Sequence, residues 1–316
     1  MADSEPRRSR RGVLAGGAAI LASGLAGCVT HLSAGGPSAE TTDSGPVELL
    51  AAGSLNHALE NGLRPTLRDR GTTLRVEARG SAALARLVDE GQKDPDIVSV
   101  ADPVLFDGPL DPPWHAAFAT NSVVIAYDPD TPGGRALADA GSEAWFRPLL
   151  DGEVTLGRTD PDLDPLGYRT LFALELATER YDTDADLREA IPSRDQLYPE
   201  TQLVSQFETG NVDAAFTYRS DALARGYEYV DLPPEIDLSD PDREETYRTV
   251  SYTLPSGKTV RGAPVRYATT IRSEPTRTVR AVFEAHATGD YLTEYGFEVP
   301  DDYPEFGGDV PDAIAE

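Results

Sequence analysis

Short apolar runs alternate with segments of helical periodicity in the part of the chain that follows residue 46. Residues 47–52 form a short apolar run, and leucines at 55, 59, 63 and 67 share one face of the segment after it. Residues 74–78 alternate as a strand does, a second helical segment opens at 80–81, and residues 96–100 are again apolar. This strand, helix, strand, helix, strand order predicts an α/β fold with a parallel sheet.

The pattern continues less regularly toward the C-terminus. We expect further strands over 122–127, 154–156, 214–218 and 265–271, and helices over 170–179, 203–207 and 277–287. A Pro-Ser-Gly turn at 255–257 joins two short segments and predicts a hairpin. Residues 231–248 hold seven acidic residues and three prolines, so we expect a surface loop there.

Composition narrows the classes of function. The 316 residues are 40% hydrophobic, which suits two domains or one large two-lobed unit. The formal charge of −26 argues against nucleic acid and anionic membranes as partners, because both attract Lys and Arg. Only two lysines occur, and an acidic, lysine-poor surface suits solubility in concentrated salt. We infer a salt-loving archaeal source, with an ordinary acidic protein from a GC-rich genome as the alternative.

The N-terminus carries an export pattern. Arginines at 7, 8, 10 and 11 precede an uncharged stretch over 12–27 that is too short to span a bilayer. Residues 1–27 therefore read as a signal peptide, and residues 9–14 look like a twin-arginine export signal.

The only cysteine, Cys28, stands at the end of a Leu-Ala-Gly-Cys sequence. This sequence looks like a lipobox, which predicts cleavage before Cys28 and a lipid on its sulfur; a free thiol is the alternative. Residues 28–46 are rich in Ser, Gly, Thr and Pro, as expected of a lipidated tether on the outer face of the cytoplasmic membrane. A single cysteine excludes an intramolecular disulfide, and the four histidines show no metal-ligand spacing.

Two serines lie where a predicted strand gives way to a helix. Ser54 and Ser81 would each add a hydroxyl to the unpaired N–H groups and positive dipole end of a helix start. Helix capping alone would explain either serine. Because both follow neighbouring strands, they should face the crevice where open α/β sheets bind ligands, and we interpret the pair as an anion site.

An unusual segment over 157–169 places three aspartates and two prolines between a strand and a helix. Helix capping and a calcium loop are both possible explanations, although the spacing does not match an EF-hand. No nucleophile elbow or phosphate loop occurs, so we expect no enzyme activity. An exported hydrolase and a surface lipoprotein without a ligand remain the alternatives.

At these segments the chain resembles the archaeal tungstate/molybdate-binding proteins of ABC importers. The matching stretches run in order through nearly all of residues 47–312 and comprise 52–55, 80–81, 96–102, 118–121, 157–169, 208–220 and 262–267. The resemblance implies a two-lobed type II periplasmic-binding-protein fold with a central cleft and two crossover strands. Lobe 1 would be 47–121 and 265–316, and lobe 2 would be 122–264, with crossings through 121–127 and 265–271.

The resemblance also implies the binding residues, no cofactor, a permease partner and a monomer. Carried over by position, the site consists of Ser54, Leu55, Ser81, Asp164, Pro165, Leu166, Glu200 and Tyr218. Asp164 and Glu200 would bind the tungsten or molybdenum itself, with Glu208 as the rival for the second carboxylate. Carboxylates repel an anion, but a hard, high-valent metal centre accepts them as ligands, which sulfate and phosphate do not. Another oxyanion or a ferric ion remains the alternative ligand.

Overall fold

The computed structural model describes residues 45–315, apart from residues 109, 163, 194, 195, 256, 258 and 274 and the side chains of 82, 200, 201 and 315. The predicted signal peptide, Cys28 and all but the last two residues of the predicted tether lie outside the described residues. Within the described part of the chain, no helix is long and apolar enough to cross a membrane.

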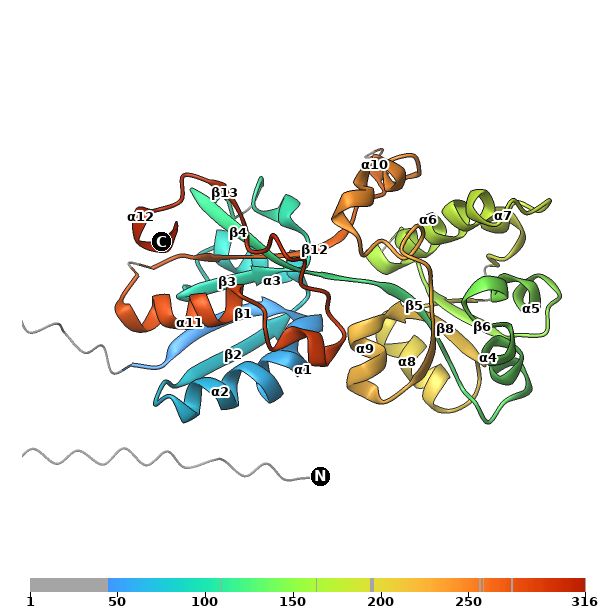
Figure 1. Cartoon of the computed structure of the whole chain (residues 1–316), viewed down its shortest axis with the longest axis horizontal. Coiled ribbons are helices and arrows are strands. Elements are labelled where there is room, and N and C mark those ends of the chain that lie inside the picture. The colour runs from blue at the N-terminus through green and yellow to red at the C-terminus, as the bar shows by residue number, and fades with distance from the viewer. Residues whose placement is uncertain are drawn as a thin grey trace, which may run out of the picture. The chain divides into compact units, whose positions relative to one another are not determined.

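The first sheet has six strands (Figure 1). Its strand order is β13 (Glu305–Gly308), β4 (Trp114–Asn121), β12 (Val265–Ile271), β3 (Ile97–Val100), β1 (Val47–Ala52) and β2 (Leu74–Arg79). Strand β1 pairs in parallel with both β2 and β3, which confirms the parallel sheet predicted from the alternation. Strand β12 runs antiparallel to β3 and β4.

The second sheet has five strands drawn from the middle of the chain. Its order is β7 (Leu197–Tyr198), β6 (Leu156–Thr159), β8 (Ala214–Tyr218), β5 (Val123–Tyr127) and β9 (Glu228–Asp231). Strand β6 is parallel to β7 and β8, whereas β5 is antiparallel to β8 and β9. Two sheets, each built from strand–helix units, give the two-lobed α/β fold that the sequence predicts.

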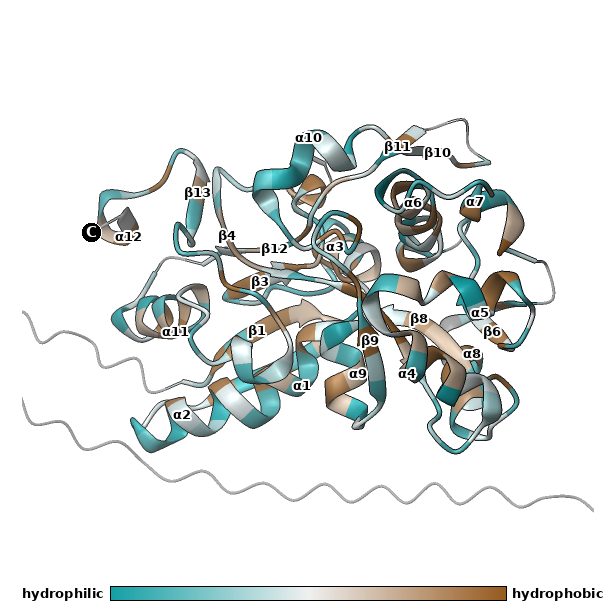
Figure 2. Cartoon of the chain, turned by 45° about the vertical axis from the view of Figure 1, so that its right-hand side comes forward, coloured by the Kyte–Doolittle hydropathy of each residue, from teal (hydrophilic) through white to brown (hydrophobic). Residues whose placement is uncertain are grey.

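Helices cover both sheets, and their apolar faces supply the core. The leucines at 55, 59, 63 and 67 are all at most 2% exposed, which confirms the helical face expected there. Figure 2 shows this arrangement as hydrophobic colour on the strands and hydrophilic colour on the outer sides of helices such as α2. After a 3₁₀ turn at Gly53–Leu55 and with a π turn at Leu59–Leu63, the helices are α1 (Asn56–Ala58), α2 (Arg64–Asp69), α3 (Ser81–Asp89), α4 (Pro132–Ala144), α5 (Phe146–Leu150), α6 (Pro165–Arg180), α7 (Leu187–Ala190), α8 (Glu200–Glu208), α9 (Arg219–Arg225), α10 (Glu244–Tyr247), α11 (Arg277–Ala287) and α12 (Asp312–Ala315).

The prediction of a surface loop over 231–248 is wrong. Ile236, Leu238 and Tyr247 in this segment are fully buried, and residues 244–247 form α10. The backbone N–H of Val123 donates to Asp237 O at 2.8 Å, and that of Val265 donates to Leu238 O at 2.8 Å. The segment therefore packs at the start of β5 and of β12, because its apolar residues lie between the acidic ones and face inward.

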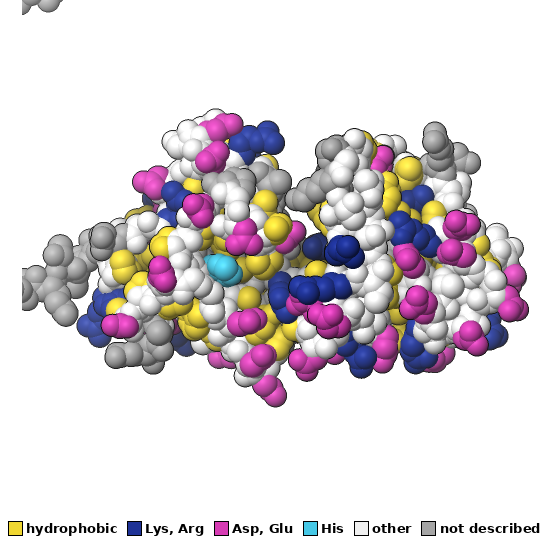
Figure 3. Space-filling model, turned by 90° about the horizontal axis from the view of Figure 1, so that it is seen from above, with side chains coloured by type: hydrophobic (Ala, Val, Ile, Leu, Met, Phe, Trp, Pro, Cys, Tyr) yellow, Lys and Arg dark blue, Asp and Glu magenta, His cyan; other side chains and the backbone are white. Residues whose placement is uncertain are grey.

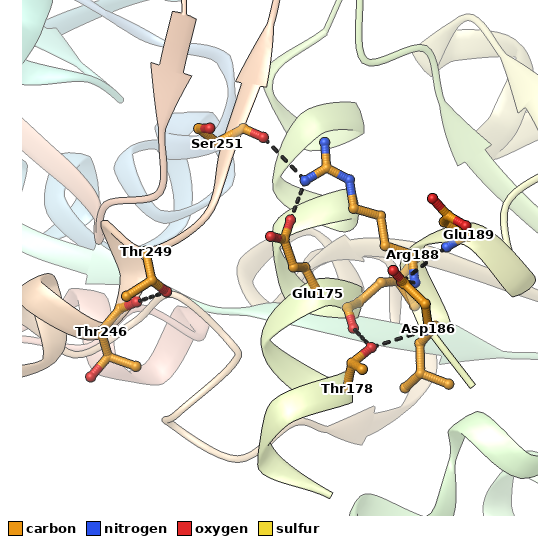
Figure 4. A network of polar contacts seen from close by, with 10 residues as sticks. Glu175, Thr178, Asp186, Arg188, Glu189, Thr246, Thr249 and Ser251 are labelled. Carbon is orange, nitrogen blue, oxygen red and sulfur yellow. Dashed lines mark hydrogen bonds and ion pairs between the residues drawn. The ribbon is translucent and has the colours of Figure 1, made fainter. Parts of the chain in front are cut away.

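The hairpin predicted around 255–257 is confirmed as β10 (Ser251–Thr253) and β11 (Thr259–Arg261). Arg188, in α7, reaches the hairpin: its Nη1 donates to Ser251 O at 3.1 Å and also to the Glu175 carboxylate (Figure 4). The Tyr252 hydroxyl donates to Asp162 Oδ1 at 2.7 Å. These contacts hold the hairpin against α7 through Arg188 and against the aspartate-rich turn before α6 through Tyr252.

Candidate functional site

The carboxyl ends of four strands of the first sheet lie along one edge. Strands β1, β2 and β3 are parallel, and β4 shares their direction because both β3 and β4 are antiparallel to β12. Ser54 follows β1, Ser81 follows β2, Ala101 follows β3 and Asn121 ends β4. This edge therefore collects the two serines singled out in the sequence, as the ligand-binding edge of an open α/β sheet does.

The second sheet brings its own carboxyl ends to the same junction. Asp164 follows β6 and Tyr218 ends β8, and these strands are parallel. Tyr218 lies opposite Val123 in the β5–β8 register, and Val123 comes two residues after Asn121. The edge that carries Tyr218 is thus joined directly to the edge that carries the serines.

Neither serine side chain caps its helix. The helical segments that follow have Ala52 and Gly80 at their N-cap positions, with no side-chain cap hydrogen bond. Ser54 Oγ lies 2.8 Å from the Tyr267 hydroxyl, and Ser81 Oγ accepts from the Ala101 N–H at 3.0 Å. The capping explanation is therefore wrong for both serines.

Asp164 does cap a helix. It is the N-cap of α6, its Oδ1 accepts from the Leu166 N–H at 2.7 Å, and Pro165 occupies the first helical position, where a missing N–H costs nothing. This cap starts α6 five residues before the expected 170. Burial raises the pKa of the Asp164 carboxyl, and the Leu166 hydrogen bond and the charge of Arg169 oppose that rise.

The cap limits what its neighbours offer a ligand. The Leu166 N–H is already donated to Asp164, and Pro165 has no N–H to donate. The contribution of Pro165 and Leu166 to binding stays a prediction. The Leu55 side chain is fully buried, so only the backbone of Leu55 could contact a ligand.

Arg169 is a residue of the site that the sequence reasoning did not select. Its side chain is buried with the residue 9% exposed, its Nη1 donates to the Tyr218 hydroxyl at 2.5 Å, and its guanidinium lies 5.7 Å from the centre of the Tyr218 ring. Burial also raises the pKa of Tyr218, so this hydroxyl keeps its proton. The available signal was its place at the end of the acidic motif over 157–169, one turn into the helix that Asp164 opens.

Two more polar residues join the lobes at this point. Asn121 Nδ2 donates to Ser220 Oγ at 2.8 Å and to the Tyr267 hydroxyl at 3.2 Å. Tyr267 and Arg169 both act electrostatically on Tyr218, so the groups of the two edges lie within range of one another. Tyr267 ends the matching stretch 262–267 but was not among the predicted binding residues, since it lies within an apolar strand.

The two candidates for a second carboxylate lie at opposite ends of α8. Glu200 opens the helix after β7, whose end pairs with the end of β6 through Thr159 and Tyr198; its side chain is outside the described residues. Glu208 ends the helix, about 12 Å away by helical rise, and its Oε1 accepts from the Tyr227 hydroxyl at 2.7 Å. The backbone geometry favours Glu200 over Glu208, and the assignment stays a prediction.

Charge is unevenly spread around the junction. Figure 3 shows acidic side chains over both halves of one face, with arginine and lysine gathered near the hollow between the halves. A separate cavity of about 740 Å³ beside Ser122 is lined by acidic residues, among them Asp231, Asp237 and Glu298, together with Arg219. Of the predicted binding residues whose side chains the structure describes, none lines that cavity, and its charge would repel an anion.

Known proteins are similar to this chain in sequence and in fold. A family model described as bacterial extracellular solute-binding protein matches residues 47–286. A Haloferax volcanii protein, provisionally named an ABC transporter molybdenum-binding protein, is 52% identical over 310 residues and 96% of each chain. A molybdate/tungstate-binding protein of Pyrococcus abyssi is 30% identical over 81% of this chain and 80% of its own. The solved periplasmic molybdate-binding protein of Azotobacter vinelandii has a TM-score of 0.52 at 12% identity, covering 81% of this chain and all of that one, which supports the fold.

Proposed function

This chain belongs to the family of bacterial extracellular solute-binding proteins, and from that premise we propose that it captures tungstate or molybdate outside the cell. It then delivers the oxyanion to the permease of an ABC importer. The names of the Haloferax and Pyrococcus relatives support this ligand. The family membership favours binding without turnover over the exported hydrolase considered from the sequence.

The observation that carries the proposal is the convergence of three hydroxyl groups at the lobe junction. Ser54, Ser81 and Tyr218 stand at carboxyl ends of strands from both sheets, and the buried guanidinium of Arg169 lies directly behind Tyr218. Hydroxyl donors, one of which is strengthened as a donor by a cation bound to its oxygen, suit a tetrahedral oxyanion. Lobe closure around the junction would then trap the ion and present the closed form to the permease.

The ligand choice rests on Asp164 and Glu200. Asp164 is partly buried at the carboxyl end of the second sheet, where a carboxylate would repel an anion that it could not coordinate. If both carboxylates bind the metal centre, tungstate and molybdate gain two ligands that sulfate and phosphate cannot use. On this proposal the site discriminates by coordination of the metal centre.

Isothermal calorimetry on the wild type and Asp164→Asn tests this proposal, with tungstate, molybdate, sulfate and phosphate at one salt concentration. The wild type should bind the first two tightly and respond little to the others. Asn caps a helix about as well as Asp, so Asp164→Asn should keep its thermal stability while tungstate affinity falls roughly 10- to 150-fold. Equal sulfate and tungstate affinity, or unchanged tungstate binding in the variant, would remove metal coordination from the site.

The remaining features belong to the same proposal. We assign export by the twin-arginine signal, a lipid on Cys28, a monomeric state and a salt-loving source. The Haloferax relative supports the source, and the family name supports an extracellular location.

A further inference from the structure

We propose that Arg169 and the Asn121–Tyr267 pair are positioning residues that fix the hydroxyl protons of Tyr218 and Ser54 toward the ligand. The inference rests on the proposed function, because it takes an oxyanion as the ligand. It concerns residues that form hydrogen bonds to the hydroxyl groups facing the ligand. Its basis is the direction of each hydrogen bond, which follows from which partner is able only to donate.

Tyr218 receives a hydrogen bond from a group that cannot accept one. The guanidinium of Arg169 has donors only, so the contact of 2.5 Å between its Nη1 and the Tyr218 oxygen uses a lone pair of the phenol. The phenol proton must therefore point to another acceptor. A charged donor on the oxygen also polarises the phenol, which makes its proton a stronger donor.

The backbone orients the Ser81 hydroxyl in the same way, by donating a hydrogen bond to its oxygen. The Ala101 N–H is only a donor, and it occupies a lone pair of Ser81 Oγ at 3.0 Å. The Ser81 proton is thus free to be donated as well.

Ser54 is oriented through a relay whose direction begins at Asn121. Asn121 Oδ1 accepts from the Ser122 N–H at 3.0 Å and lies 3.4 Å from the Ser220 N–H, which identifies the other amide atom as the NH₂ group. That NH₂ donates to the Tyr267 oxygen at 3.2 Å. With the Asn121 amide on one lone pair of its oxygen, Tyr267 has Ser54 Oγ, 2.8 Å away, as an acceptor for its proton. In our proposal the bond runs in this direction, which leaves the Ser54 proton for the ligand.

As a result, the hydroxyls of Ser54, Ser81 and Tyr218 each have a proton available to donate to the ligand before it binds. A fully deprotonated oxyanion offers only acceptors, so no hydroxyl has to turn on binding. Preorganised donors of this kind bind more tightly than rotating ones because the ordering cost is already met.

A double-mutant cycle separates positioning from direct contact. Tungstate affinity would be measured for Arg169→Met, Tyr218→Phe and the double variant, at one salt concentration. We expect each single change to lower affinity about 10-fold. The double variant should be no weaker than Tyr218→Phe, because Arg169 acts through the hydroxyl that this change removes.

Arg180→Met is the matched control. Arg180 lies on the same helix and also faces a tyrosine ring, with its guanidinium 5.4 Å from the centre of Tyr181, so it tests for a general effect of losing an α6 arginine. Its tungstate affinity should equal that of the wild type. Arg169→Lys, which keeps a charged donor, should recover part of the affinity lost in Arg169→Met.

Several results would overturn the inference. Losses that add in the double variant would mean that Arg169 acts by a route other than the Tyr218 hydroxyl, either on the ligand itself or through Asp164, which its charge also affects. Full affinity in Arg169→Met or in Tyr218→Phe would remove the positioning role. If Arg169→Met does not fold, the cycle of Tyr267→Phe with Ser54→Ala decides by the same criterion. A wild type that binds neither tungstate nor molybdate would overturn the proposed function itself, a result distinct from additivity in a wild type that binds.

Discussion

Buried polar residues at the lobe junction have partners that set both their direction and their charge. Asp237, which is not one of the predicted binding residues, is an example. It is 6% exposed, and its carboxylate accepts from the Ser239 N–H at 2.9 Å and from the Ser239 hydroxyl at 3.0 Å. Burial raises the pKa of Asp237 to about 7. The hydrogen bonds from Ser239 oppose this rise, and repulsion from Glu298 and Asp240 adds to it. The residue is therefore partly protonated at neutral pH.

This carboxyl predicts a pH-dependent stability. In the unfolded chain Asp237 titrates near its ordinary pKa of 3.8, whereas in the folded protein it titrates near 7. Between these values the folded state holds the extra proton, so the free energy of unfolding falls as pH rises through the window and stays low above it. The free energy of unfolding of Asp237→Asn does not fall in this window. Relative to the wild type, the variant should therefore be more stable at pH 8 than at pH 5 by roughly 2–3 kcal/mol.

Denaturant unfolding at both pH values and fixed salt measures the difference. Asp242→Asn is a suitable control, since Asp242 is an exposed acidic residue lining the same cavity. A gap between Asp237→Asn and the wild type that is equal at the two pH values would contradict the raised pKa.

At the scale of elements, the start of α6 sets the position of Asp164. The aspartate-rich turn folds back over the helix, and the backbone passes close to Gly167. A Cβ built on Gly167 would lie 2.5 Å from Pro161 N and 2.6 Å from the carbonyl carbon of Asp160. These are backbone atoms that cannot rotate away, so the glycine of the Asp-Pro-Leu-Gly-Tyr sequence is required by the turn.

We therefore predict that Gly167→Ala weakens both folding and binding. Pushing the turn away from α6 should cost about 1–3 kcal/mol of unfolding free energy, in the range of overpacked sites. Tungstate affinity should also fall, because Asp164 moves with the turn.

Gly80→Ala provides the comparison, since the added Cβ would have nothing within 4 Å and Gly80 opens the other helix at the cleft. Thermal unfolding and a tungstate titration of the two variants together check the prediction. Equal behaviour of both would show that the close approach at Gly167 has no consequence.

At the scale of the whole molecule, the two sheets are joined where β4 leads into β5 and where the chain returns to β12. Buried residues 236–238 bond to the first residue of β5 and of β12, so the junction is braced on both strands. The binding groups lie at this junction, which couples ligand contact to the relative position of the lobes.

Attachment to the membrane also belongs to this scale, and we predict that it depends on Cys28 alone. Cys28→Ser removes the sulfur that would carry the lipid, so the protein should be released into the medium or stay uncleaved. Fractionation of cells expressing the full chain, with the mass of the released protein, measures this. A variant as membrane-bound and as processed as the wild type would contradict the lipobox interpretation.

The sequence by itself determined the elements whose signal is local. Apolar runs and the helical spacing of apolar residues predicted β1, β12 and α11 with the observed bounds, because the period of burial along one strand or helix is written in consecutive residues. Order along the chain then implied a parallel sheet. The two serine turns indicated Ser54 and Ser81, and the family resemblance added Asp164 and Tyr218 as candidates.

Only the tertiary structure decided which partners these residues have. Ser54 bonds to Tyr267, which is 213 positions away, and Asn121 bonds to Ser220 across 99 positions. It also buried residues 236–238 within a segment whose acidic composition predicted a surface loop. Local periodicity reports that a side chain is buried but not against what, since the partner is chosen by how distant strands come together. Arg169, Asn121 and Tyr267 lie in stretches that match the family, but only their tertiary contacts place them beside the predicted binding residues.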